Sequence, residues 1–403
     1  MPLKLLIQLS WRNIWRHRRR NGIMLLAICF AVGGVVFLNS LIRGMQYEMA
    51  EAAIDNLTGH VKILKPGYLD DPSIEKSFAL AKEWGPELSD EVLVGWAARV
   101  RVPAVLMSER ETRGVQLVGI DPASESISFF GDVDMAGETL ASRADRRIVI
   151  GKTMAEQLET VVGRRVVLIS QGADGLNREA GYRIAGIYDA AGTGLEKIYV
   201  FTGMDTVQGM LDANVVTEVS FRLTEDRFSQ GVIDRLVNSF TGVDVLTWQE
   251  LEPQAAAMYA FADTGIFIWF LIVMGALVFG LVNTLVTAVM ERVRELGMLR
   301  AVGMRARSVV VQVVLESSLI MLLGVAAGVG LGLVLFALVA DGIDLSAFAE
   351  GVEMAGLRTL FVPVLVVDDI VLVVVMSLVL GVVASLYPAR RAVKINALEA
   401  MRR

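Results

Sequence analysis

Four long apolar runs divide the chain, and polar segments separate them. Each run reaches the roughly 20 residues that an α-helix needs to cross a bilayer core of about 30 Å. Hydrophobic residues make up 54% of the 403 positions, a larger share than in most soluble chains. The pattern therefore predicts a membrane protein with four transmembrane helices, at 21–43, 263–290, 308–340 and 370–388.

Residues 44–262 show a different pattern, with short β-branched runs between polar turns. Such runs predict strands, and amphipathic stretches between some of them predict helices. The segment is long enough for a core of its own, and for two lobes. The predicted fold class is membrane α-helical, with a large extracytoplasmic α+β domain inserted between transmembrane helices 1 and 2. The predicted strands are 60–64, 93–107, 114–120, 147–150, 165–170, 182–188, 197–201, 218–223 and 243–246, and the predicted helices are 152–160, 204–211 and 227–240.

Positive charge is distributed unevenly among the segments that join the apolar runs. The first 20 residues, the segment 291–307 and the tail 389–403 are rich in arginine and lysine, whereas the loop 341–369 is mostly acidic. The positive-inside rule then places both termini and 291–307 in the cytoplasm, and 44–262 on the outer side. This distribution predicts a multi-pass protein of the inner (cytoplasmic) membrane.

The N-terminal segment 1–20 is amphipathic. Its apolar positions form an i, i+4 row, and cations lie beside that row. A helix that lies in the cytoplasmic headgroup layer fits this pattern, with tryptophan at the interface. A segment that only sets orientation is the alternative. The apolar row is Leu3, Ile7, Trp11 and Trp15.

The chain offers little catalytic or metal-binding chemistry. Cys29 is its only cysteine, and its two histidines, His17 and His60, fall on opposite sides of the predicted membrane. Ile150–Thr153 reads IGKT, but Arg146 stands where a phosphate loop begins with glycine, so we expect a strand–turn–helix corner there. The net charge of −6 gives no sign of nucleic-acid binding. We expect no catalytic residue, metal or cofactor in this chain.

The charged segment 291–307 separates the second and third apolar runs. It is too polar for hydrocarbon and must lie in water. Val293, Leu296 and Leu299 recur at three-residue intervals, so a helix here would carry a narrow apolar stripe. We interpret the segment as a docking helix for a soluble partner, which makes the chain one subunit of a larger assembly.

Small residues recur at four-residue intervals in the last two apolar runs. Such rows allow helix backbones to approach one another closely. They predict helix packing, either within one subunit or between two subunits. The rows are Gly324, Gly328 and Gly332 in the third run and Ser377, Gly381 and Ser385 in the fourth.

Several motifs together resemble the FtsX/MacB-type (type VII, mechanotransmission) ABC transporter permeases. The stretch ERVRELGMLRAVGMR is similar to the coupling helix of that family, and YPARRAVKINALEAMR is similar to its closing motif. LSWRNIWRHRRR resembles its amphipathic entry helix, while IVIGKTMAEQL and YRIAGIYDAAGTGLEKIYVF resemble segments of its outside domain. The resemblance spans nearly the whole chain.

The resemblance implies a permease subunit that hydrolyses no ATP itself. Two separate ABC ATPase subunits would bind ATP and Mg²⁺, and a second permease subunit, identical or homologous, would complete the transporter. Stalk helices would relay ATP-driven motion to the outside domain, without a central pore for cargo. The coupling residues carried over from the family are Glu291, Arg292, Glu295, Leu296, Leu299, Arg300 and Gly303.

Within the family, size and the lack of a fused ATPase make the chain most similar to the lipoprotein-releasing LolC/LolE branch. That branch implies a lipoprotein cargo and a periplasmic chaperone. However, the predicted hairpin-like loop 171–180, which is rich in turn-forming residues, is short and lacks the proline-rich character of the chaperone-binding hook. Lipid-linked cargo would enter between the first helix of one subunit and the second helix of its partner. The candidate contact residues, which could equally be lipid-facing surface, are Phe37, Leu38, Leu41, Met45, Phe261, Ile266, Phe267 and Phe270.

Two other functions stay open at the level of sequence. One is a membrane scaffold that moves its outside domain to activate a periplasmic enzyme and transports nothing. The other is efflux of a small molecule or peptide together with periplasmic partners.

Overall fold

The computed structural model describes residues 3–16, 18–81, 84–131, 133–190, 194–291, 298, 305–344 and 360–394. The packing of the chain divides it into two units. The described parts of Met1–Tyr47, Ala260–Asp344 and Leu360–Arg403 form a helical unit, and those of Glu48–Tyr259 form an α/β unit.

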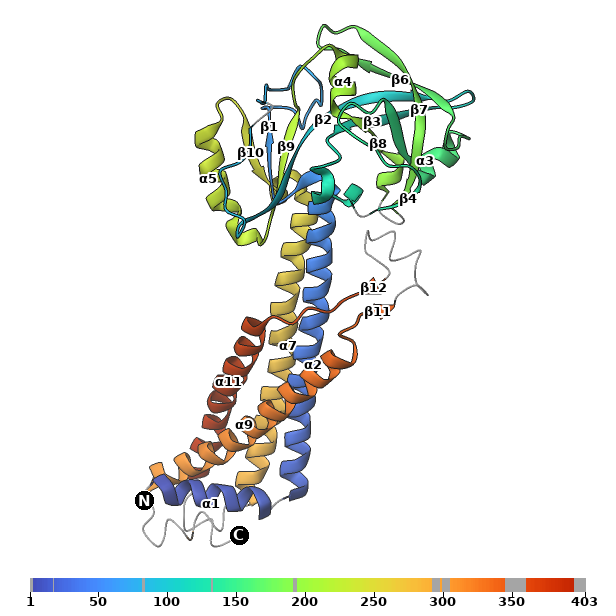
Figure 1. Ribbon diagram of the computed structural model, residues 1–403. Helices are drawn as coiled ribbons and strands as arrows, with labels where there is room; N and C mark the ends of the chain where they lie inside the picture. Colours follow the sequence, from blue (N-terminus) through green and yellow to red (C-terminus); the bar gives the residue numbers. More distant parts are fainter. Residues whose placement is uncertain are drawn as a thin grey trace. The chain divides into compact units, whose positions relative to one another are not determined.

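Four helices of the described chain are long and apolar enough to cross a membrane, as predicted. They are α2 (Arg18–Ala53), α7 (Pro253–Glu291), α9 (Ala306–Leu338) and α11 (Val367–Lys394) (Figure 1). At about 1.5 Å per residue, α2 and α7 are longer than a bilayer requires. Both helices begin in one unit and end in the other.

The helical unit has an apolar core. Met24, Ile28 and Val32 of α2 are buried there with Met274 of α7 and Ile320 of α9. Large apolar side chains also cover the outside of these helices, as expected for helices surrounded by lipid. Between α9 and α11 in the chain, the short strands β11 (Ile343–Asp344) and β12 (Leu360–Phe361) form an antiparallel pair.

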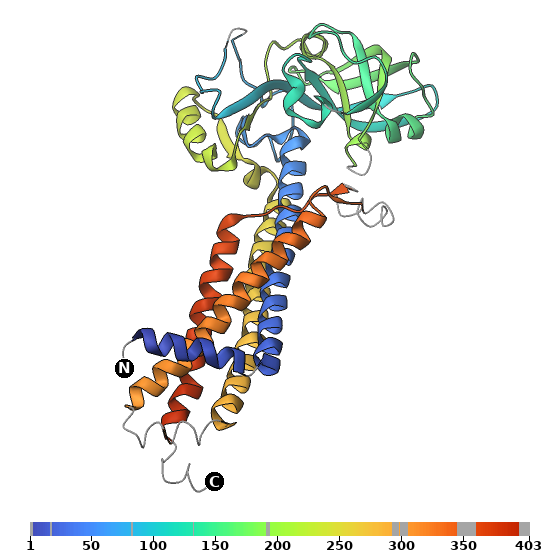
Figure 2. The ribbon, with the colours of Figure 1, turned by 60° about the horizontal axis from the view of Figure 1, so that its bottom comes forward.

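The N-terminal helix α1 (Leu3–Arg16) runs across the lower ends of the other helices of this unit (Figure 2). Ile14 is buried on its inner face, while Trp11 and Trp15 are 44% and 56% exposed. The Ser10 hydroxyl approaches the backbone carbonyl of Gln312 in α9, and Asn21 donates a 2.9 Å hydrogen bond to the Ile14 carbonyl. An amphipathic helix with outward tryptophan and inward isoleucine suits a membrane surface.

The described part of the α/β unit is built on a ten-stranded mixed sheet. The strand order is β10-β1-β9-β2-β3-β8-β5-β7-β4, and β6 pairs with β2 and β7. The strands are β1 (Val61–Leu64), β2 (Leu93–Met107), β3 (Thr112–Ile120), β4 (Asp134–Gly137), β5 (Arg147–Gly151), β6 (Arg165–Gln171), β7 (Asn177–Asp189), β8 (Tyr199–Gly203), β9 (Glu218–Leu223) and β10 (Asp244–Thr247).

Strand β2 joins two lobes of this unit. Its first half, Leu93–Arg99, pairs with β9, and its second half, Val100–Met107, pairs with β3. One lobe therefore contains β1, β9 and β10, and the other contains β3 to β8. The remaining helices are α3 (Lys152–Gln157), α4 (Met204–Leu211), α5 (Ser229–Ser239), α6 (Trp248–Leu251), the π-helical turn η1 (Ile54–Thr58) and the 3₁₀ turns η2 (Glu125–Ile127), η3 (Phe129–Gly131), η4 (Leu195–Lys197) and η5 (Asp226–Phe228).

The sequence pattern missed parts of this sheet. Strand β4 is exposed and short, so it carries no apolar run. The hairpin predicted at 171–180 is present between β6 and β7, but its turn is shorter than predicted, because Gln171 already pairs with Asn177. Its outward side chains are polar, and only residues 172–176 form the turn.

Candidate functional site

The predicted coupling segment is described only at its edges. Glu291 ends α7, and its carboxylate lies 2.6 Å from the guanidinium of Arg20 at the start of α2. The isolated residue Met298 is half exposed. The other predicted coupling residues, Arg292, Glu295, Leu296, Leu299, Arg300 and Gly303, lie outside the described residues.

The glycine row of α9 packs against α2 of the same chain. A Cβ atom on Gly324 would lie 2.7 Å from Ile28, and one on Gly328 would lie 2.8 Å from the Cβ of Val32. A Cβ on Gly332 would likewise meet Val36 at 2.8 Å. The absence of side chains at these positions is what permits the close approach of the two helices. Of the two predicted alternatives, the structure shows packing within the subunit for this row.

The small residues of α11 also face the inside of the helical unit. Ser377 and Ser385 are fully buried, and the Ser377 hydroxyl lies 3.4 Å from the sulfur of Met274 in α7. Ser385 donates to the carbonyl of Val382. A Cβ on Gly381 would lie 2.7 Å from the side chain of Met321 in α9. This row therefore holds α11 against α7 and α9.

The predicted cargo-contact residues divide into two groups. Phe261 and Phe267 are 78% and 55% exposed on α7, as a lipid contact requires. Ile266 and Phe270 are only 8% and 4% exposed, and Phe270 belongs to the apolar core of the helical unit. The prediction is wrong for these two, since a helix that is apolar on every face gives no sequence signal for its buried side. Phe37, Leu38, Leu41 and Met45 on α2 are partly buried.

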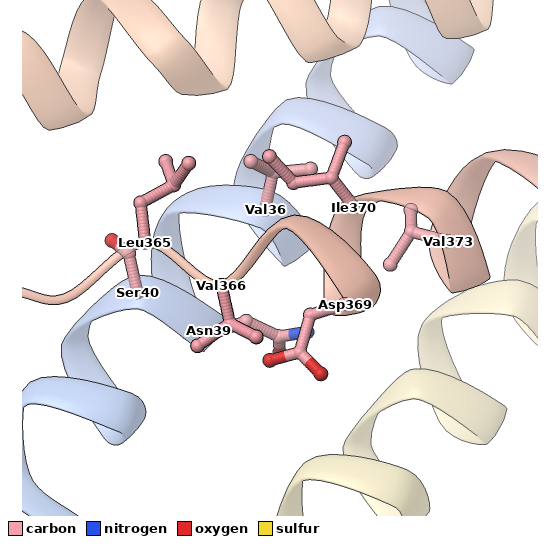
Figure 3. A pocket seen from close by; sticks show the side chains of 8 residues that line it. All are labelled: Val36, Asn39, Ser40, Leu365, Val366, Asp369, Ile370 and Val373. Carbon is pink, nitrogen blue, oxygen red and sulfur yellow. The ribbon is translucent and has the colours of Figure 1, made fainter. Parts of the chain in front are cut away.

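A polar cluster lies near the outer end of the membrane helices. Arg43 of α2 binds Asp369 of α11 through two hydrogen bonds of 2.7 and 3.0 Å, and it also binds Asp263 of α7 at 2.7 Å and Gln46 at 2.9 Å. One arginine thus joins three helices. Next to it, the side chains of Asn39 and Asp369 lie close together beside a cavity of about 10 Å³ (Figure 3). The side-chain amide oxygen (Oδ1) of Asn39 is buried without a hydrogen-bond partner among the described residues.

Within the α/β unit, a second arginine binds the last turns of α2 and the turn that follows them. Arg222 of β9 binds Glu51 of α2 at 2.6 Å and also binds Asp55 of η1. The two carboxylates are four residues apart and so lie on one face of the helical chain. Both ion pairs are about three-quarters shielded from solvent, because the side chains are 20–23% exposed.

The π-helical turn η1 carries an unusual backbone that the sheet holds in place. Leu57 has a φ of 58°, which is rare for a residue with a side chain. Its carbonyl accepts hydrogen bonds from Arg99 of β2 at 2.7 Å and from Ser220 of β9 at 2.9 Å. Gly59 follows with a φ of 69°, and a Cβ there would lie 2.7 Å from the carbonyl oxygen of Phe221. The joint between helix and sheet is therefore tightly specified.

Arg99 belongs to a buried cluster of charges. It binds Glu125 of η2 at 2.7 Å, and Glu218 of β9 lies between Arg99, Arg101 and Lys62 of β1. Burial by itself raises the pKa of Glu218, but the three cations outweigh it and hold the pKa at about 2. Burial among cations also lowers the pKa of Lys62 to about 7.

The start of α7 is attached at the same place. Trp248 of α6 is buried against Ala53 and Ile54, at the end of α2. The Trp248 backbone N–H donates to the His60 carbonyl at 3.0 Å, and its indole N–H donates to Asp226 at 3.2 Å. Ala255 and Ala256 of α7 pack against the same cluster, so the ends of α2 and α7 lie together beside the residue that precedes β1. We call the contacts of Arg222, Arg99 and Trp248 with these helix ends the stalk anchor.

Sequence reasoning missed the stalk anchor, although a signal was present. Arg99 and Arg222 are cations inside otherwise apolar, strand-like runs. A charge in such a position must find a partner when the strand is buried. The carboxylate that binds Arg99 belongs to Glu125, 26 residues away. The one that binds Arg222 belongs to Glu51, 171 residues away. The motif IGKT, by contrast, forms the expected corner, where β5 ends at Gly151 and α3 begins at Lys152.

Comparison with known proteins agrees with this architecture. Residues 22–238 match the MacB-like periplasmic core domain, and residues 266–397 match the FtsX-like permease C-terminal family. The chain belongs to this family of permeases. The predicted resemblance to FtsX/MacB-type permeases is therefore confirmed.

Relatives of the permease match over its whole length. The lipoprotein-releasing system transmembrane protein LolC of Neisseria meningitidis serogroup B is 25% identical over 96% of each chain. LolC of Xylella fastidiosa (strain Temecula1) is 24% identical over 100% of this chain and 99% of its own. The macrolide export ATP-binding/permease protein MacB of Escherichia coli is 24% identical over 97% of this chain and 59% of its own. The chain is thus a permease subunit of the LolC/LolE or MacB type of ABC transporter, and an inner-membrane protein.

Solved structures resemble the permease in part. The extracellular domain of the noncanonic ABC-type transporter YknZ from Gram-positive bacteria covers 46% of this chain and 99% of its own, with 16% identity and a TM-score of 0.34. The periplasmic region of MacB from Actinobacillus actinomycetemcomitans covers 48% of this chain and 91% of its own, with 9% identity and a TM-score of 0.33.

Proposed function

We propose that the permease serves a lipoprotein-releasing ABC transporter and relays motion from separate ATPase subunits to its α/β unit. In this proposal the ATPase binds the segment 291–307. The membrane helices α2 and α7 then move, and the α/β unit moves with them. The cargo is a lipoprotein taken from the outer leaflet of the inner membrane. The full-length similarity to LolC proteins supports this cargo class.

The stalk anchor is the observation that carries the relay. A helix transmits displacement only when both of its ends are held, since a loose joint would absorb the motion. The outer end of α2 is held by the two ion pairs of Arg222 and by the hydrogen bonds to the Leu57 carbonyl. Glu51 connects α2 to β9, and η1, which follows α2 directly, is bonded to β9 and β2, two neighbouring strands inside the sheet.

The sheet then distributes the displacement inside the α/β unit. Strand β9 pairs with β1 and β2, and β2 continues into the second lobe. A rigid movement of the helix ends would therefore reach both lobes through main-chain hydrogen bonds. In the proposed function, this movement displaces the lipoprotein or passes it to a periplasmic chaperone, and a second permease subunit completes the cargo path.

The coupling step is tested with Leu299→Asp. A charge in the predicted apolar stripe would be desolvated by a bound ATPase, at a cost of several kcal/mol if unpaired. We expect normal membrane insertion but loss of the ATPase in a pull-down from native membranes. Met298→Asp is the matched control. Consecutive residues on a helix are about 100° apart around its axis, so Met298 would lie beside Leu299 but outside the predicted apolar stripe. Retained ATPase association with Leu299→Asp would contradict the coupling role.

The cargo is tested separately with the copurified transporter in proteoliposomes. ATP-dependent release of a triacylated lipoprotein into the soluble fraction is the expected result, with a vanadate-inhibited sample as the control. An assembled, ATP-hydrolysing transporter that releases no lipoprotein would overturn the cargo assignment and leave the relay intact. Efflux of a small molecule in the same vesicles would instead support the MacB-like alternative.

A further inference from the structure

An apolar groove runs between α2 and α7, within the helical unit. It has a volume of about 570 Å³ and lies toward the α1 end of these helices, away from the cargo-contact residues predicted near the other end. Its lining includes Arg20, Met24 and Ala27 of α2 and Ala276, Gly280 and Leu281 of α7.

Small side chains create this groove. Ala27 of α2 and Ala276 and Gly280 of α7 lie in its walls, and a Cβ on Gly280 would meet nothing within 4 Å. The floor is apolar, since Met24 and Leu281 are 6% and 2% exposed. A surface of this kind offers an alkyl chain dispersion contacts along its length and requires no hydrogen bonds from it.

One end of the groove is positively charged. Arg20 lines it there, and Arg18 and Arg19 are exposed beside it. Glu291 neutralises only one of these three charges, through its contact with the Nη1 atom of Arg20. The described charges at this end therefore favour an anion.

The helix α1 sets the depth of this end in the membrane. It is followed directly by α2, and Arg18 donates a 3.2 Å hydrogen bond to the carbonyl of Trp15. Trp11 and Trp15 are exposed and in edge-to-face contact. Exposed tryptophans on an amphipathic helix lie at the level of lipid headgroups. The corner Arg18–Arg20 therefore meets headgroup phosphates, and the groove extends from there into the hydrocarbon.

We propose that this groove binds one anionic phospholipid. An acyl chain lies along the wall of Ala27, Ala276 and Gly280, and the phosphate is held at the corner Arg18–Arg20. The lipid is a resident of the leaflet next to α1. It is distinct from the cargo, which the proposed function takes from the opposite leaflet, and it does not depend on that function.

The test uses the full-length permease reconstituted in nanodiscs of phosphatidylethanolamine and phosphatidylglycerol. The protein is then transferred to mild detergent, and bound lipid is identified by native mass spectrometry. Gly280→Leu places a side chain in the groove, and its Cβ would meet no protein atom within 4 Å. Gly275→Leu is the matched control, since Gly275 is equally open but does not line the groove. We expect retained phosphatidylglycerol in the wild type and in Gly275→Leu, and its loss in Gly280→Leu.

Two further arms decide what occupies the groove. Arg20→Gln should shift the bound lipid from phosphatidylglycerol toward phosphatidylethanolamine while the groove stays filled. A photo-crosslinking residue at Ala27 should attach to lipid. Equal lipid retention in Gly280→Leu and Gly275→Leu would overturn the proposal. A crosslink from position 27 to a second polypeptide would also overturn it, because a helix of another subunit would then fill the groove.

Discussion

The guanidinium of Arg43 in α2 is bound to the carboxylate of Asp369 in α11 by two hydrogen bonds, of 2.7 and 3.0 Å. The two residues are 326 positions apart in the chain. A bidentate contact of this kind fixes direction as well as distance. It lies near the outer end of the helical unit, where the side chains are 21% and 15% exposed.

Arg43→Gln should destabilise the helical unit by about 1.5–3 kcal/mol, the range for hydrogen bonds to a charged group. The reason is that Asp369 keeps its charge but loses its main partner in a partly shielded position. Thermal unfolding of the purified permease in detergent measures the change. The double variant Arg43→Gln with Asp369→Asn should recover part of the loss. If the single and double variants lost the same thermal stability, the assigned contact between Arg43 and Asp369 would be contradicted.

Gly328→Leu should separate α9 from α2. Its Cβ would lie 2.8 Å from the Cβ of Val32 and 2.9 Å from the Cys29 carbonyl oxygen, so the backbone must move. Overpacking of this kind costs about 1–3 kcal/mol. Gly330→Leu in the same helix is the control, because a Cβ there meets nothing within 4 Å. A difference in melting temperature between the two variants is expected, and equal melting temperatures would show that the helices do not pack through this row.

Arg222→Ala should weaken the stalk anchor. The substitution removes two ion pairs and leaves Glu51 and Asp55 partly shielded without their cation. In the copurified transporter we expect normal ATPase association and ATP hydrolysis but reduced lipoprotein release. Arg227→Ala is the control, since Arg227 is 70% exposed and its pair with Glu225 is worth little. Unchanged release with Arg222→Ala would show that the relay does not use this joint.

Glu218→Gln should be among the most destabilising single changes in the α/β unit. It leaves Lys62, Arg99 and Arg101 without their shared carboxylate, and breaking a buried ion pair costs about 3–5 kcal/mol. Lys62→Met keeps the approximate shape of the side chain and removes one of the three cations. It should therefore lower the free energy of unfolding far less than Glu218→Gln does. Chemical unfolding of the full chain, followed by tryptophan fluorescence, measures the free energy of unfolding of both variants. A similar loss of stability in Glu218→Gln and Lys62→Met would contradict the role of Glu218 as the shared carboxylate of the three cations.

Lys62 should also give the permease a pH-dependent stability. Burial lowers its pKa in the folded chain to about 7, compared with 10.5 in an unfolded chain. Between these values the unfolded state binds more protons, so the contribution of Lys62 to stability rises as the pH increases. We expect the melting temperature of Lys62→Met, relative to the wild type, to fall between pH 7 and pH 9. A constant difference across this range would exclude the lowered pKa.

Much of the architecture could be predicted because its signals are local. The four membrane helices follow from the length of the apolar runs, and the strands around Val61, Val219 and Phe221 follow from β-branched and aromatic composition. Strand β4 and the first residues of β7, within the predicted hairpin loop, were not predicted as strands. Their side chains are mostly polar and exposed, and cross-strand hydrogen bonds make them strands.

The sequence alone determined that the chain spans the membrane four times, that a sheet-containing domain follows the first span, and that the motifs belong to a permease family. Hydropathy, alternation and motif spacing act over a few neighbouring residues, so they can be read from the sequence. Only the tertiary structure decided that Phe270 is buried while Phe267 is exposed, that Gly328 faces Val32, and that Arg222 binds the end of α2. These outcomes depend on which distant segments pack together, and an apolar helix or a lone buried arginine does not specify its partner by itself.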